Sequence, residues 1–119
     1  MYEALEAAAE RFADAPEAQP FLDERLTRMP SLVSDLEFLL GADWKQQITP
    51  VPATGRYVAR INEVADEGWV GGFIAHHYTR YLGDLSGGQA IGRLMKRQFG
   101  FETEGILFYL FEQIPDAKT

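Results

Sequence analysis

The sequence predicts an all-α protein. Apolar residues recur at helical spacing in four segments, no segment shows the alternation of a β-strand, and a proline or glycine separates neighbouring segments. At 119 residues, with 46% hydrophobic and 13% aromatic residues, the chain has enough apolar side chains for one core. We therefore expect a single helical domain over residues 1–119.

The first predicted helix covers residues 2–12, and the loop ADAPEAQP follows it at 13–20. Its apolar stripe consists of Tyr2, Leu5, Ala9 and Phe12. The second predicted helix begins at Pro30 and stops at Gly41, because proline suits a first helical turn and glycine suits the position after a last turn. Its expected inward residues are Leu32, Val33, Leu36 and Leu39.

The sequence ITPVP interrupts the chain before a third predicted helix at 53–66, which Gly68 ends. The inward residues of this helix are Tyr57, Val58, Ile61 and Val64. Residues 69–99 form the longest segment, about 46 Å if fully helical at ~1.5 Å per residue. A looser tail at 101–119 closes the chain.

The composition excludes several classes of function. The chain has no cysteine, so disulfides, thiolate catalysis and cysteine-ligated metals are excluded. A net charge of −7 argues against a nucleic-acid partner, and the basic residues Arg93, Lys96 and Arg97 are expected to be a solvated helix face. No apolar run approaches the ~18 residues of a membrane span, and we expect a cytoplasmic protein.

Helix geometry sorts the side chains of residues 69–99 onto two faces. An arc of about 100° holds His76, Arg80, Gly83, Asp84 and Gly87. The expected core face holds Val70, Ile74, Tyr81, Leu85, Met95 and Phe99. This helix therefore has an apolar back and a front of bare backbone flanked by charge, and the run at 86–88 is where it is expected to bend.

The glycines on this helix require an explanation. Each costs about 1 kcal/mol relative to alanine in a helix interior, so Gly83, Gly87 and Gly88 weaken the helix by about 3 kcal/mol. Small residues four apart permit either tight helix–helix packing or the close approach of a flat ligand. Arg80 and Asp84 on the same face favour a ligand, because a packing contact would bury both charges.

Residues 85–89 spell LSGGQ, the signature pentapeptide of ABC-type ATPases. Such a cassette also needs a G-x-x-x-x-G-K-[ST] loop, and the sequence contains none. The chain is also too short for a cassette, so we interpret the match as chance.

Three stretches of the chain resemble heme oxygenases of the soluble bacterial type: YEALEAAAE at the start, PATGRYVARINEV at 52–64 and AHHYTRYLGDLSGGQAIGRLMKRQFG at 75–100. The resemblance implies a fold in which heme lies between a proximal helix and a kinked distal helix, here residues 69–99. It implies a monooxygenase that opens heme at a meso carbon to biliverdin, carbon monoxide and ferrous iron. Heme would be substrate and cofactor, O2 the oxidant, and a ferredoxin or an NAD(P)H-dependent reductase the electron donor.

The resemblance also implies roles for individual residues. Gly83 and Gly87 would approach the heme face and flank the dioxygen site. Asp84 would hold an ordered water there, with Arg80 and Tyr2 in the network around it. The pocket edge would consist of Tyr78, Thr79, Leu82 and Ser86.

The family pattern is incomplete in this chain. The family's axial histidine precedes the segment that matches Tyr2, and its final helices would follow Thr119. We therefore expect an internal fragment that supplies no metal ligand and has little turnover by itself. His76 and His77 lie on the distal helix and are not expected to replace the axial ligand. Two alternatives stay open: a non-catalytic heme- or tetrapyrrole-binding module, and a ligand-free helical packing domain.

Overall fold

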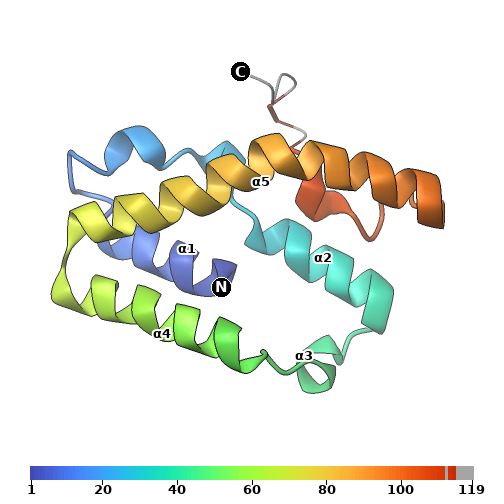
Figure 1. Cartoon of the computed structure of the whole chain (residues 1–119), viewed down its shortest axis with the longest axis horizontal. Coiled ribbons are helices and arrows are strands. Elements are labelled where there is room, and N and C mark those ends of the chain that lie inside the picture. The colour runs from blue at the N-terminus through green and yellow to red at the C-terminus, as the bar shows by residue number, and fades with distance from the viewer. Residues whose placement is uncertain (112, 115–119) are drawn as a thin grey trace. The chain divides into compact units, whose positions relative to one another are not determined.

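The computed structural model describes residues 1–111, 113 and 114. These residues form helices joined by turns, and none of them lies in a strand, so the all-α prediction is confirmed. The chain divides into two compact units. Unit 1 comprises Met1–Thr27 and Thr49–Arg80, and unit 2 comprises Arg28–Ile48 and Tyr81–Thr119. Figure 1 labels the α-helices in chain order.

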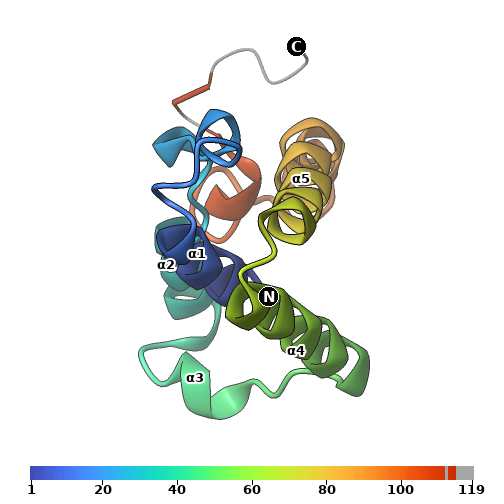
Figure 2. The same ribbon diagram turned by 90° about the vertical axis from the view of Figure 1, so that its left-hand side faces the viewer.

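Unit 1 contains α1 (Tyr2–Arg11), α4 (Pro52–Glu67) and residues 70–80 of α5 (Val70–Phe99). Helices α1 and α4 pack side by side, as both Figure 1 and Figure 2 show. Two short 3₁₀ turns, η1 (Gln19–Phe21) and η2 (Glu24–Leu26), follow α1. The first of them overlaps the predicted loop.

The core of unit 1 forms from the apolar stripes that the sequence predicts on α1 and α4. Leu5, Ile61 and Val64 are almost fully buried, and Phe73 joins them from α5. The ring of Phe12 stacks on that of Phe73, with centroids 4.8 Å apart. Because aromatic rings bury large apolar areas, this stack holds the first part of α5 in unit 1.

The boundary between α4 and α5 depends on a glycine. Gly68 has φ 67°, in the left-handed region that other residues rarely adopt, and its N–H donates to the carbonyl of Ala65 at 3.1 Å. This cap ends α4 at the predicted residue, and α5 begins two residues later.

Unit 2 contains α2 (Met29–Leu40), α3 (Trp44–Gln47), residues 81–99 of α5 and the 3₁₀ turn η3 (Leu107–Tyr109). Pro30 lies in the first turn of α2, and Gly41 follows its last residue with φ 94°, as predicted. Helix α2 packs against η3. The short helix α3 was not predicted, and it buries Trp44.

Two residues assigned to the core by helical periodicity are exposed. Phe99 is 65% exposed and Leu39 is 49% exposed. Phe99 is the last residue of α5, more than a turn beyond Gly92, where Tyr109 packs. Leu39 is likewise in the last turn of α2. A helical wheel assigns a face but cannot show how far along the helix a partner extends.

Candidate functional site

Gly83 and Gly87 present bare backbone to open space on α5. A Cβ atom built at either position meets nothing within 4 Å among the described residues, outside the adjacent backbone of its own helix. The packing hypothesis requires a neighbouring element at these two positions, and the described part of the chain provides none. This surface is therefore open to the close approach of a ligand.

The predicted edge residues are also accessible. Within unit 2, Leu82 is 40% exposed and Ser86 is exposed. The Ser86 hydroxyl donates to the carbonyl of Leu82 at 2.8 Å, a bond that tends to bend helices. Within unit 1, Thr79 is exposed, and Tyr78 is half exposed with its ring edge-on to Phe21 at 6.2 Å. The bend at 86–88 stays a prediction.

Asp84 is the acidic group beside the open glycines. Its side chain is only partly exposed, and burial raises its pKa above the ordinary 3.8. The carboxyl group therefore keeps its proton to a higher pH than an exposed aspartate does. This is the direction required of a group that supplies protons near neutral pH.

Tyr2 and Arg80 meet in unit 1. Tyr2 is buried on α1, and its hydroxyl donates to the backbone carbonyl of Arg80 at 3.5 Å, across 78 residues of sequence. The first helix therefore reaches this turn of α5 within unit 1. Their participation in a network with Asp84 stays a prediction.

The two histidines of α5 are both engaged inside unit 1. His76 Nδ1 lies 3.4 Å from the Tyr57 hydroxyl, and the two rings meet edge-on at 5.5 Å. His77 is buried with its ring 5.6 Å from that of Phe73, and this burial lowers its pKa below 6.5. His77 is on the core side, as predicted. Among the described residues, no group of three or more His, Cys, Asp and Glu could hold a metal ion.

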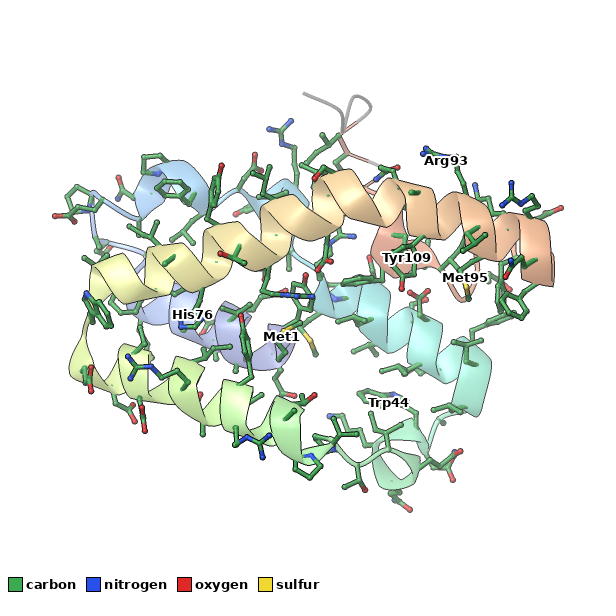
Figure 3. All side chains as sticks on the ribbon, viewed as in Figure 1. Met1, Trp44, His76, Arg93, Met95 and Tyr109 are labelled. Atoms are coloured by element: carbon green, nitrogen blue, oxygen red, sulfur yellow. The ribbon has the colours of Figure 1, made fainter. Side chains whose placement is uncertain are left out.

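The other two glycines of this stretch have a different environment. Gly88 and Gly92 are buried, and a Cβ built on them would lie 3.3 Å from Cδ1 and 3.2 Å from Cβ of Tyr109, respectively. Figure 3 shows Tyr109 on the opposite side of α5 from Arg93. The helical wheel places Gly88 and Gly92 on the core face, and this signal could have identified them as packing residues.

Sequence reasoning also missed Asp35. Its carboxylate is buried on α2 and accepts hydrogen bonds from the backbone N–H groups of Leu107 and Phe108, both at 2.8 Å. Burying a carboxylate is energetically unfavourable, and here the two bonds offset that penalty and fix the chain around η3. An aspartate at an inward position of an apolar helix was the available signal.

Two surface features agree with the composition. Arg93, Lys96 and Arg97 are all exposed, as predicted for a solvated face. Within the described residues, none of the helices combines the length and apolar character that crossing a membrane requires.

Comparison with known proteins gives a consistent result. The model of the heme oxygenase family matches residues 1–119. A heme oxygenase of Rhodella violacea is 40% identical over 119 residues, which are 99% of this chain and 50% of that protein. A heme oxygenase of Takifugu rubripes is 41% identical over 113 residues, which are 93% of this chain and 40% of that protein.

Solved structures show the same similarity. Heme oxygenase-2 from Synechocystis sp., in complex with heme and NO, matches with a TM-score of 0.89 and 37% identity over 98% of this chain and 48% of that chain. Heme oxygenase from Leptospira interrogans matches with a TM-score of 0.87 and 36% identity over 98% of this chain and 57% of that chain. The chain thus spans about half the length of the relatives that it matches.

Proposed function

Because the chain belongs to the heme oxygenase family, we propose that it supplies the distal helix of a heme-degrading monooxygenase. In this proposal the enzyme opens heme at a meso carbon to biliverdin, carbon monoxide and ferrous iron. O2 is the oxidant, and a ferredoxin or an NAD(P)H-dependent reductase supplies the electrons. The observation that carries the proposal is the open backbone at Gly83 and Gly87.

The geometry of this surface suits a flat substrate. Gly83 and Gly87 lie four residues apart, so they occupy the same side of α5 on successive turns. A planar macrocycle could approach both turns closely, because neither position presents a Cβ atom. Leu82 and Ser86, the residues preceding these glycines, offer one apolar and one polar side chain at the edge of this surface. This pairing suits a ligand with an apolar ring and polar substituents.

In the proposed reaction, Asp84 is the proton-transfer residue. Its pKa, raised by burial, favours a carboxyl group that holds a hydrogen-bonded water and passes protons through it. Arg80 lies one helical turn before Asp84, and the Tyr2 hydroxyl binds its backbone carbonyl. As the family resemblance implies, we assign Tyr2 and Arg80 to the network around Asp84, and Tyr78 and Thr79 to the pocket edge.

Absorbance titration with hemin tests the proposal. The unsubstituted chain should give a saturable Soret shift, and Gly87→Leu should weaken binding by about tenfold, or ~1.4 kcal/mol, because its side chain occupies the open surface. Gly55→Leu is the matched control, because a Cβ atom built at Gly55 on α4 also meets nothing within 4 Å. It should bind hemin as the unsubstituted chain does.

Three results would count against the proposal. No saturable shift would mean that heme is not the ligand. Equal weakening by Gly87→Leu and Gly55→Leu would mean that the glycine surface is not the contact. The third contrary result concerns the addition of a reductant: a heme spectrum that persists without biliverdin would support the non-catalytic heme-binding module. Slow growth of biliverdin absorbance, slower still in Asp84→Asn, would instead support catalysis.

A further inference from the structure

Residues 106–111, here called the Tyr109 segment, are held by two helices within unit 2. From α2, Asp35 accepts two backbone N–H bonds at 2.8 Å. Arg28, just before α2, donates from Nη1 to the carbonyl of Phe108 at 2.9 Å. From α5, the Gln89 side chain donates from Nε2 to the carbonyl of Tyr109 at 3.2 Å. Backbone groups at three successive residues, 107–109, are therefore bound by side chains.

Two buried charged residues serve this one segment. Asp35 is 5% exposed and Arg28 is 4% exposed, and the guanidinium of Arg28 also lies 3.8 Å from the centre of the Phe111 ring. Burying charged groups is costly unless they make strong hydrogen bonds. Two buried charged groups that bind the backbone of one three-residue 3₁₀ turn hold this turn in a defined position.

The Tyr109 segment also contacts α5. Because Gly88 and Gly92 lack side chains, the α5 backbone comes into close contact with Tyr109 at both positions. Gly87 immediately precedes Gly88 and faces the open side of the helix. A displacement of Tyr109 would therefore reach the open surface within one helical turn.

We propose that Asp35 is a positioning residue, which fixes the Tyr109 segment and, through Tyr109 against Gly88 and Gly92, sets the position of the open Gly83–Gly87 stretch. The relevance of this stretch to heme rests on the proposed function. The coupling between Asp35 and this stretch is independent of the proposed function. The four glycines at 83–92 of α5 consequently divide into two pairs, Gly83 and Gly87 for the ligand, and Gly88 and Gly92 for the support behind it.

Hydrogen exchange measured by mass spectrometry tests the coupling without heme. Asp35→Asn keeps the size of the side chain but cannot accept both N–H bonds with the same strength. We expect faster exchange, by about tenfold, at amides 107–110 and also at amides 83–92 of α5. Asp43→Asn is the matched control in the same unit, because it makes the same change of charge at an exposed aspartate whose carboxylate binds Gln47. It should leave 83–92 unchanged.

Faster exchange confined to amides 107–110 would mean that Asp35 stabilises only η3 and has no effect on α5, and it would overturn the proposal. If Asp35→Asn unfolds unit 2 as a whole, Gln89→Met decides. This variant removes the donor to Tyr109 and keeps a good helix former. It should raise exchange at 83–92 by a smaller factor, and no change there would overturn the proposal.

A spectroscopic measurement separates this inference from the proposed function. At saturating hemin, Asp35→Asn should shift the Soret maximum relative to the unsubstituted chain, and Asp43→Asn should not. If hemin fails to bind the unsubstituted chain, the proposed function fails while the exchange pattern still decides the coupling. If hemin binds and the Soret maximum does not move in Asp35→Asn, the heme-positioning role is wrong.

Discussion

The glycines of α5 allow a prediction in which fold stability and ligand binding change in opposite directions. Replacing Gly83 or Gly87 by alanine should stabilise the chain, because alanine is favoured over glycine in a helix interior by about 1 kcal/mol. The added methyl meets nothing within 4 Å among the described residues, so no packing penalty opposes this gain. Each substitution should raise the free energy of unfolding by about 1 kcal/mol, and the double substitution by about 2 kcal/mol.

Gly88 and Gly92 should respond differently. At Gly92 the new methyl would lie 3.2 Å from Tyr109 Cβ, an atom fixed to the backbone that side-chain rotation cannot move away. Overpacking of this kind costs about 1–3 kcal/mol, so Gly92→Ala should lose about 1 kcal/mol net after the gain in helix propensity. At Gly88 the contact is a ring atom, Cδ1, at 3.3 Å. A small tilt of the ring relieves it, so Gly88→Ala should change stability by less than about 0.5 kcal/mol.

Urea unfolding followed by far-UV circular dichroism measures these differences as shifts of the midpoint at constant slope. Hemin titration of the same variants supplies the second measurement. Gly83→Ala and Gly87→Ala should be more stable and yet bind hemin more weakly, whereas Gly55→Ala should leave hemin binding unchanged. A Gly87→Ala variant that gains stability and also binds hemin normally would refute the ligand surface. A Gly92→Ala variant more stable than the unsubstituted chain would refute the close contact with Tyr109.

Three further predictions concern single side chains. Because burial lowers the pKa of His77, the unfolded chain takes up a proton first as the pH falls below 6.5. The unsubstituted chain should therefore lose stability as the pH falls below 6.5, and His77→Gln should lose less in the same urea assay. Burial raises the pKa of Asp84, so the folded chain takes up this proton first, and the unsubstituted chain should gain stability relative to Asp84→Asn as the pH falls toward 3.8. Thermal unfolding should show that Phe73→Ala costs about 3–5 kcal/mol because Phe73 is 1% exposed, whereas Phe99→Ala, at a position 65% exposed, should cost less than about 0.5 kcal/mol.

Much of the helical architecture is predictable from the sequence because its signals are local. The apolar stripe of α1, the first-turn proline of α2 and the glycine cap after α4 each act within a few residues of their own position. The exposed pair Gly83 and Gly87 was also predictable, since helical spacing alone places them together on one face. Periodicity and capping therefore suffice for the longer helices and for the open side of α5 at Gly83 and Gly87.

The support behind that face was not predictable in the same way. Asp35 binds backbone groups 72 and 73 residues further along the chain, and no local pattern specifies such a partner. The contact of Tyr109 with Gly88 and Gly92 likewise joins a short 3₁₀ turn to a helix, and the turn has no periodicity of its own. Phe99 shows the converse error, since its position on the apolar arc is correct but its side chain is 65% exposed.

The two pairs of glycines explain how residues 83–92 of α5 can contain four glycines. A stretch with Gly83, Gly87, Gly88 and Gly92 is intrinsically weak, by about 4 kcal/mol relative to alanine. At Gly88 and Gly92 the fold recovers part of this loss, because close approach lets Tyr109 pack on the helix backbone and lets Gln89 bind the Tyr109 carbonyl. At Gly83 and Gly87 the described residues supply no such compensation. The described residues therefore leave the remaining cost in stability without compensation, which agrees with the proposal that this bare surface serves a ligand.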